Sequence, residues 1–228
     1  DLSEKVLSTG ADFGIAVDPD VDRLAFMDEK GELFGEEYTL VACADYVLGH
    51  TKGNTVSNLS STRALRDVTV KHGGTYTASA VGEVNVVAAM KANKAIIGGE
   101  GNGGIILPEF HYGRDALVGI ALFLSLLAEK QMSVSALKNT YPLYFMSKKK
   151  IDLNPNIDVD ALLSATEKSY QNEPLTTVDG VKIDFVNSWV HLRKSNTEPI
   201  IRIYTEAPTQ QQADALAERF ISELKALS

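Results

Sequence analysis

The sequence predicts an α/β domain, with a mixed sheet and helices on both of its faces, followed by a small α+β domain with an antiparallel sheet. Two patterns predict this. Strand-like and helix-like segments alternate from about residue 33 to residue 145, which is typical of packed layers of helix and sheet. Beyond Lys148–Lys150, which we interpret as a solvated strand end, strands follow one another and helices stand at the two ends.

The first part of the chain divides after an acidic loop. Residues 1–32 contain only two strands, too little sheet to be stable alone, so we expect them to be the tail of a domain whose earlier part is missing. Residues 33–146 should then form the α/β domain. Strands are predicted over 13–17, 24–27, 54–59, 75–80 and 94–98, and helices over 38–48, 62–72, 83–92 and 114–129.

Residues 147–228 should form the α+β domain. Asp179-Gly180 is typical of a tight hairpin turn, and Thr209 with Gln212 is typical of a capping box that begins the last helix. Strands are predicted over 181–185, 189–193 and 200–205, and helices over 158–170 and 210–227.

The composition excludes several classes of protein. With 44% hydrophobic and 23% charged residues, the chain has an ordinary globular composition. Its net charge of -8 argues against a nucleic-acid or membrane-surface binder, and no apolar stretch is long enough to span a membrane. The one cysteine, Cys43, lies in an apolar helix-like run, so we expect a core thiol and a cytoplasmic location.

Three carboxylates follow the first predicted strand. Asp18, Asp20 and Asp22 alternate along an extended segment, so their oxygens can converge on one hard divalent cation such as Mg²⁺. Arg23 adds a planar fork that is suited to a phosphate. A metal site beside a phosphate donor indicates phosphoryl chemistry.

Three other interpretations of this acidic loop stay open. A calcium EF-hand loop fits the acidic positions, but it needs glycine where Arg23 stands and a helix where a strand precedes. An aspartyl-nucleophile loop of the haloacid-dehalogenase type would make Asp18 a covalent phosphoryl acceptor and leave Asp22 unexplained. A solvated acidic turn needs no ligand at all.

Two further loops carry polar groups that could bind a ligand. Residues 98–104 hold five glycines with Glu100 and Asn102, which could approach a ligand closely and bond to sugar hydroxyls, although a glycine-rich turn between strands is equally compatible. Residues 193–199 could form an anion nest, or a plain polar hairpin. The phosphate donors in and beside this second loop are Arg193, Ser195, Asn196, Thr197 and Arg202.

Together, and in this order, the three loops resemble those of the α-D-phosphohexomutase superfamily, which includes phosphoglucomutase/phosphomannomutase and phosphoglucosamine mutase. The family's metal loop reads Asp-Gly-Asp-Gly-Asp-Arg, its sugar loop Gly-Glu-x-Ser-Gly-His, and its phosphate loop Arg-x-Ser-Asn/Gly-Thr-Glu-Pro. Residues 193–199 match the last in full. Pro19 and Val21 replace the glycines of the metal loop, while Asn102 and Gly104 replace the serine and histidine of the sugar loop.

The resemblance implies four domains around a cleft, of which this chain would hold the end of the second and all of the third and fourth. The missing N-terminal domains would carry the phosphoserine nucleophile, so the chain alone is expected to be inactive. It also implies a phosphosugar substrate, Mg²⁺ held by Asp18, Asp20 and Asp22, and catalytic assistance from Arg23. Glu100 and Asn102 would bind the sugar, and the residues around Arg193 would bind its phosphate.

The function predicted is therefore interconversion of hexose 1-phosphate and hexose 6-phosphate, of glucosamine, mannose or glucose, through a 1,6-bisphosphate. Two other classes remain open. A phosphatase with Asp18 as its nucleophile would not need the loop at 193–199. A non-catalytic phosphosugar-binding module would need that loop but no metal.

Overall fold

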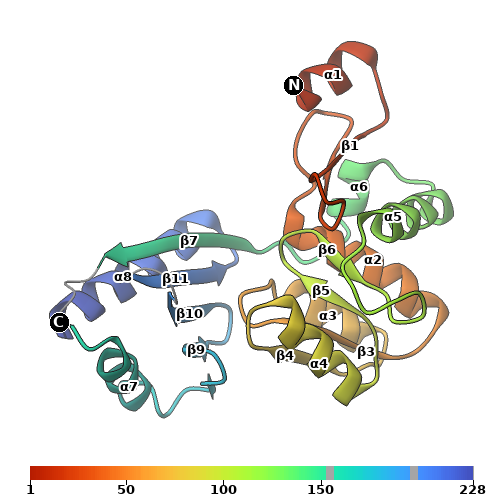
Figure 1. Cartoon of the computed structure of the whole chain (residues 1–228). Helices are drawn as coiled ribbons and strands as arrows, with labels where there is room; N and C mark the ends of the chain where they lie inside the picture. Colours follow the sequence, from red (N-terminus) through yellow and green to blue (C-terminus); the bar gives the residue numbers. More distant parts are fainter. Residues whose placement is uncertain (153–156, 196–199, 228) are drawn as a thin grey trace. The chain divides into compact units, whose positions relative to one another are not determined.

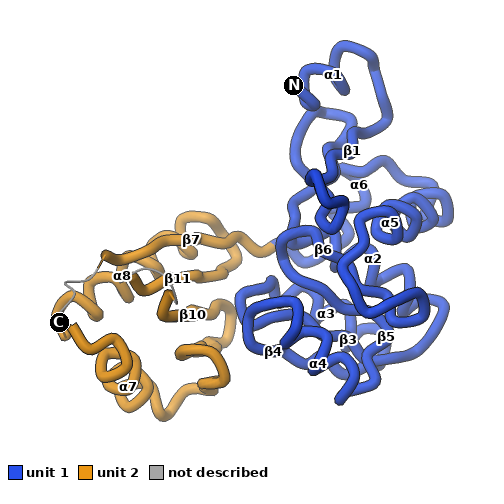
Figure 2. Tube along the Cα trace, viewed as in Figure 1, with its two compact units in different colours: residues 1–143 blue, residues 144–228 orange. Residues whose placement is uncertain are grey.

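The computed structural model of the chain describes residues 1–152, 157–195 and 200–227. The chain folds into two compact units, unit 1 over Asp1–Leu143 and unit 2 over Tyr144–Ser228 (Figure 2). Figure 1 shows the order of their helices and strands along the chain. Among the described residues no helix is both long and apolar enough to cross a membrane.

The main sheet of unit 1 is mixed, as predicted. Its strands lie in the order β4-β3-β5-β6, where β3 is parallel to both neighbours and β6 is antiparallel to β5. The bounds of these strands are β3 Asn54–Asn58, β4 Tyr76–Ser79, β5 Ala95–Glu100 and β6 Gly104–Ile106. The helices of this layer are α2 Glu36–His50, α3 Ala64–Lys71, α4 Glu83–Asn93 and α5 Ala116–Lys130.

Alternation along β3 explains why helices cover both faces of this sheet. The hydroxyl of Thr55 lies 2.6 Å from that of Thr69 in α3, whereas the next residue, Val56, packs in a cluster with Val86 and Met90 of α4. Successive side chains of a strand point to opposite faces, so α3 and α4 must lie on opposite sides.

A two-stranded antiparallel hairpin, β1 Gly14–Val17 and β2 Leu24–Met27, carries the acidic loop. It is fixed to the rest of unit 1 by an aromatic cluster. The Phe26 ring stacks on Phe123 of α5 at a centroid distance of 3.8 Å, and Phe34 meets the same ring edge-on at 5.0 Å. The position of the acidic loop is therefore set by core packing.

Three short elements of unit 1 were not predicted from the sequence: α1 Leu2–Thr9, α6 Val134–Lys138 and β6. Side chains cap both helices. Asp1 and Glu4 form a capping box at the start of α1, and Ser133 accepts a hydrogen bond from the backbone of Ala136 at the start of α6. Cys43 is buried within α2, as predicted, and burial raises the pKa of its thiol.

Unit 2 holds a five-stranded antiparallel sheet in the order β7-β11-β10-β9-β8. The strands are β7 Phe145–Asp152, β8 Leu175–Thr176, β9 Val181–Asp184, β10 Trp189–Lys194 and β11 Ile200–Ala207. The helices are α7 Val159–Ser169 and α8 Gln210–Leu227. The lysine run predicted to be a strand end lies inside edge strand β7.

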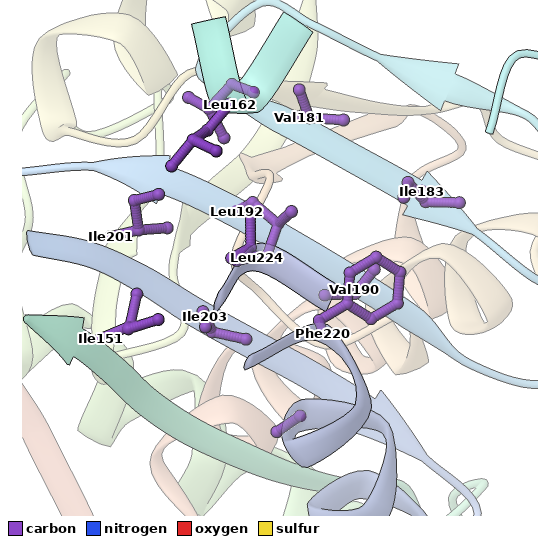
Figure 3. Packing of buried hydrophobic residues seen from close by; sticks show 12 residues of the cluster. Ile151, Leu162, Val181, Ile183, Val190, Leu192, Ile201, Ile203, Phe220 and Leu224 are labelled. Carbon is purple, nitrogen blue, oxygen red and sulfur yellow. The ribbon is translucent and has the colours of Figure 1, made fainter. Parts of the chain in front are cut away.

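Apolar side chains from one face of this sheet pack against α7 and α8. Figure 3 shows this core, in which Ile203 of β11 and Leu192 of β10 face Phe220 and Leu224 of α8, with Leu162 of α7 nearby. The opposite face of the sheet carries the alternate residues of the same strands, and many of these are charged.

Candidate functional site

The acidic loop connects β1 to β2, and its carboxylates converge. One oxygen from each of Asp18, Asp20 and Asp22 lies within 4.8 Å of the other two. Asp20 is exposed and the other two are half-buried, so the group opens to solvent on one side. Clustered carboxylate oxygens of this kind are the donors that hard divalent cations prefer.

Asp18 organises the backbone of this loop. Its side-chain oxygen accepts hydrogen bonds from the backbone N–H groups of Asp22 and Arg23, at 3.1 and 3.0 Å. Arg23 Nε lies 2.7 Å from Asp18 and 3.3 Å from Asp22. The backbone N–H of Arg23, with its side chain and the donors of Asp22, lowers the pKa of Asp18 to about 2, so this carboxylate stays ionised.

Val21, at the apex of the loop, has a backbone φ of +56°. This left-handed conformation is costly for a β-branched residue, and glycine adopts it readily. The backbone is held in place by a hydrogen bond of 3.1 Å from the N–H of Ala116 to the carbonyl of Val21. The loop therefore keeps its shape at the cost of local strain.

Arg114 connects the acidic loop to the glycine-rich loop, a role that was not predicted from the sequence for this side chain. Its Nη2 forms an ion pair with Asp22, its Nη1 lies 3.1 Å from Glu100, and its Nε lies 3.4 Å from Glu83. Burial and the hydrogen bond with Asp18 raise the pKa of Asp22, and the charge of Arg114 opposes that rise. One guanidinium thus faces carboxylates from three segments of the chain.

Glu100, at the end of β5, is buried and its carboxylate is well supplied with donors. One oxygen accepts from the side chain of Asn58 at 2.9 Å and from the backbone of Gly82 at 3.2 Å. The other accepts from Arg114 at 3.1 Å and from Asn102 at 3.5 Å. In this conformation Glu100 holds the surrounding loops together, and its contact with sugar hydroxyls stays a prediction.

Asn102 lies next to the acidic loop. It lines a cleft of about 350 Å³ together with Asp18, Arg23 and Glu36. Its side-chain oxygen accepts from the backbone N–H of Gly104 at 3.1 Å, which fixes the turn. The structure therefore brings the predicted metal loop and the predicted sugar loop to one cleft in unit 1.

The hydroxyl residues before α3 support the glycine-rich loop. Ser61 Oγ accepts from the backbone N–H of Gly101 at 3.1 Å, and Thr62 Oγ1 accepts from that of Ala64 at 3.2 Å. Thr62 thus fixes the turn that leads into α3. Ser61 positions the neighbouring loop instead.

The predicted phosphate loop lies in unit 2, between β10 and β11. Arg193 Nε lies 2.9 and 2.8 Å from the two oxygens of Asp179, which orients the guanidinium. Ser195 is buried, and its backbone N–H bonds to the carbonyl of Ile200 at 3.0 Å. Arg202 lies directly opposite Arg193 on β11. Two other predicted members of this loop, Asn196 and Thr197, lie outside the described residues.

Two domains of one known protein family match most of the chain. Residues 35–144 match the phosphoglucomutase/phosphomannomutase alpha/beta/alpha domain III, and residues 149–223 match the C-terminal domain of the same family. A phosphoglucomutase/phosphomannomutase of Thermococcus kodakarensis is 35% identical over 97% of the chain, and a phosphoglucosamine/phosphogalactosamine mutase of Sulfurisphaera tokodaii is 31% identical over 99%. The chain spans about half the length of these relatives, 49% and 50%.

Solved structures agree with this assignment. A phosphoglucomutase/phosphomannomutase family protein from Burkholderia thailandensis matches 97% of the chain, and 48% of its own, with a TM-score of 0.83 and 26% identity. The fold of an Aspergillus fumigatus N-acetylphosphoglucosamine mutase, solved with GlcNAc-6P and magnesium, is similar at a TM-score of 0.63 and 16% identity over 90% of the chain and 47% of its own. On these matches, the chain belongs to the α-D-phosphohexomutase superfamily.

Proposed function

We propose that this chain is the part of a phosphohexomutase that holds the metal, the sugar and the distal phosphate. The whole protein would interconvert hexose 1-phosphate and hexose 6-phosphate through a phosphoserine and a 1,6-bisphosphate. The observation that carries the proposal is the shared cleft of unit 1, where Asp18, Arg23 and Asn102 line one cavity. Membership in the family supports the reaction class.

The acidic loop fits Mg²⁺ by the chemistry of its donors. Three carboxylate oxygens within 4.8 Å of one another offer the hard ligands that this ion takes. Bound there, Mg²⁺ would offset the negative charge that develops during phosphoryl transfer. Asp18 is suited to this role because its low pKa keeps it ionised at neutral pH.

Arg23 would steady the transferring phosphoryl group. Its Nε is engaged by Asp18 and Asp22, which holds the side chain beside the three carboxylates. Its terminal nitrogens would then bond to phosphate oxygens. Asn102, which lines the same cleft, would contact the sugar.

The loop around Arg193 would bind the phosphate that is not reacting. Both ends of the hexose must react in turn, so the bisphosphate must reorient between the two transfers. A clamp that recognises only phosphate accepts either orientation. Asp179 supports this role, since its contact with Nε orients the guanidinium of Arg193, whose terminal nitrogens would bond to phosphate oxygens.

Calorimetry with MgCl₂ tests the metal site directly in this chain. Asp20→Asn should weaken Mg²⁺ binding, and Asp12→Asn, just before β1, serves as a matched control. Affinity should be weak even in the unsubstituted chain, because the phosphoserine oxygen expected to complete the shell is not supplied here. Unchanged binding in the Asp20 variant would place the ion elsewhere.

Phosphate recognition is tested separately at the other loop. Arg193→Ala should weaken binding of 1-phospho and 6-phospho hexoses alike, by about 1.5–3 kcal/mol for a lost charged hydrogen bond. Free hexose binding as tightly as its phosphate would contradict the assignment. Glucosamine, mannose and glucose phosphates compared on the full-length protein would identify the substrate.

Turnover separates the mutase from its alternatives. Phosphorus NMR should show no conversion of a 6-phosphohexose by this chain alone, and conversion once N-terminal domains carrying phosphoserine are supplied with a trace of 1,6-bisphosphate. Steady turnover by the chain alone would indicate a nucleophile such as Asp18. Sugar-phosphate binding that survives loss of the metal loop, with no turnover in the full protein, would indicate a binding module.

A further inference from the structure

Arg114 is anchored so that its guanidinium is the part free to respond to a change at either loop. Its backbone N–H donates to Glu83 Oε1 at 3.1 Å, and its Cδ fills the space beside Gly104, where a Cβ atom would lie 2.5 Å away. Its side chain is 19% exposed. Among the described residues that line the cleft of unit 1, which include Asp18 and Asn102, Arg114 is absent. It therefore acts on that cleft through the residues that it contacts.

The guanidinium of Arg114 is shared between two loops. Its Nη2 forms an ion pair with Asp22, and its Nη1 lies 3.1 Å from Glu100 Oε2. Asp22 is also one of the three carboxylates that converge in the acidic loop. The same side chain thus pairs with Arg114 and offers an oxygen to a divalent cation. A cation that neutralises Asp22 would leave more of the positive charge of Arg114 to Glu100.

The surroundings of Arg114 favour such a transfer of charge. One guanidinium faces three carboxylates, those of Asp22, Glu83 and Glu100, so negative charge is in excess. Glu100 is buried and Arg114 is largely withdrawn from water, and solvent screens the interaction between them less than it would at the surface. A change of charge at Asp22 should therefore alter the strength of the contact between Arg114 and Glu100.

Two further donors of Glu100 make such a change observable. Its Oε1 accepts from the side chain of Asn58 at 2.9 Å and from the backbone N–H of Gly82 at 3.2 Å, whereas its Oε2 accepts from Arg114. The two oxygens share one negative charge, so a stronger pull on Oε2 weakens the hydrogen bonds to Oε1. Asn58 ends β3 and Gly82 precedes α4, so both report on Glu100 from outside the acidic loop.

Holding the two loops together does not by itself account for the position of Arg114. Backbone hydrogen bonds already fix the acidic loop to its surroundings. The N–H of Leu24 donates to the carbonyl of Gly103 at 3.3 Å, and the N–H of Ala116 donates to that of Val21 at 3.1 Å. The bridge through Arg114 adds an electrostatic link between a carboxylate of each loop.

We propose that Arg114 is a positioning residue that couples the binding of a divalent cation at the acidic loop to the hydrogen bonds of Glu100. Without a cation, Asp22 and Glu100 share the guanidinium, and when Asp22 ligates a cation, Arg114 binds Glu100 more strongly. This inference rests on the proposed function, in which Asp22 holds Mg²⁺ and Glu100 binds the sugar. By linkage, the metal site and the sugar site would then change each other's affinity through Arg114.

The test is an NMR titration of the ¹⁵N-labelled chain with MgCl₂, against sodium chloride at matched ionic strength. Saturable shifts are expected at the amides of residues 18–23 and, with the same Kd, at the Gly82 amide and the Asn58 side-chain amide. In Arg114→Lys the shifts at 18–23 should remain, because the positive charge is kept. Those at Gly82 and Asn58 should be lost, because a single ammonium group does not reproduce the fork that binds both carboxylates. Arg66→Lys, an exposed position on α3, is the matched control and should keep both sets of shifts.

The unsubstituted chain alone can overturn the proposal, whatever the stability of the variants. Shifts at residues 18–23 with none at Gly82 and Asn58 would exclude the coupling and leave the metal site intact. No shifts at residues 18–23 would exclude the metal site, and the coupling with it. Equal shifts at Gly82 and Asn58 in Arg114→Lys and Arg66→Lys would show that the signal reaches Glu100 without Arg114, which would also overturn the proposal.

Discussion

Arg114 and Asp22 form an ion pair that links the acidic loop to the glycine-rich loop, because the same guanidinium also reaches Glu100 at 3.1 Å. Glu100 is buried, with only 6% of its surface exposed. Removing the cation that pairs with a buried carboxylate lowers the free energy of unfolding by several kcal/mol. Replacing Arg114 should therefore destabilise unit 1 more than replacing an exposed arginine does.

We expect Arg114→Gln to lower the free energy of unfolding by about 2–3 kcal/mol. Saturating MgCl₂ should recover part of the loss, since a bound cation replaces the positive charge beside Asp22. Thermal unfolding with and without MgCl₂ measures both effects, and Arg66→Gln, on the exposed side of α3, is the control. Equal stabilisation of the variant and the unsubstituted chain by Mg²⁺ would show that Arg114 and the ion do not share Asp22.

Relief of strain at Val21 gives a prediction of opposite sign. Its φ of +56° is unfavourable for valine and not for glycine, so Val21→Gly should raise the stability of unit 1 by about 0.5–1 kcal/mol, after the larger chain entropy of glycine is subtracted. Urea unfolding measures the change. The Val21→Ala variant keeps a residue with a Cβ atom at the unfavourable φ, so its stability should increase much less. A loss of stability in the glycine variant would mean that the valine side chain contributes more than its strain costs.

The acidic loop, the glycine-rich loop and the phosphate loop could all be found from the sequence, because each follows a strand pattern and is rich in polar residues or glycine. The contact of Arg114 with Asp22 could not be found in this way. These residues are far apart in sequence and meet because the hairpin packs against α5, where Phe26 stacks on Phe123 and the N–H of Ala116 bonds to the carbonyl of Val21. Pairings set by core packing leave no local pattern.

Elements with a clear apolar pattern, such as α5 and β11, were predicted from the sequence. Of strand β7 only the lysine run was predicted, as a strand end, because the run is polar and the pairing of the strand with β11 is a long-range contact. The helix α6 was also missed, because it has five residues and depends on capping by Ser133. Propensity alone rarely specifies such short elements.

Glu29 should make unit 1 sensitive to acid. Burial by itself would raise its pKa, but hydrogen bonds from Ser135 and Ser133 outweigh this and lower the pKa from 4.5 to about 2. Because the folded-state pKa lies below the unfolded value, the stabilisation is present above pH 4.5 and is lost as the pH falls toward 2.

Glu29→Gln should therefore cost about 1 kcal/mol at pH 7, after allowance for partial exposure, and progressively less below pH 4.5. Urea unfolding at pH 7, 5, 4 and 3 gives the difference between the two proteins at each pH. Glu109→Gln, at an exposed position, should show no such trend. A difference that stays constant from pH 7 to pH 3 would contradict the role of the ionised carboxylate.

Gly104 stands where the resembling family has histidine, and the structure gives a physical reason why a side chain does not fit. A Cβ atom at this position would lie 2.5 Å from Cδ of Arg114 and 3.1 Å from the side-chain oxygen of Asn102. Arg114 cannot easily move away, because Asp22 and Glu100 hold its guanidinium. The space beside the glycine-rich loop is thus occupied by the arginine.

Gly104→Ala should accordingly lower the free energy of unfolding by about 1–3 kcal/mol, the usual cost of overpacking. In a chain that already carries Arg114→Ala the same change should cost much less, since the clashing atoms are gone. Urea unfolding of the two single variants and the double variant gives the coupling energy, which we expect to exceed about 1 kcal/mol for side chains in direct contact. Additive costs would mean that Gly104 is required for the loop backbone itself, and that Arg114 does not take up the space of the missing side chain.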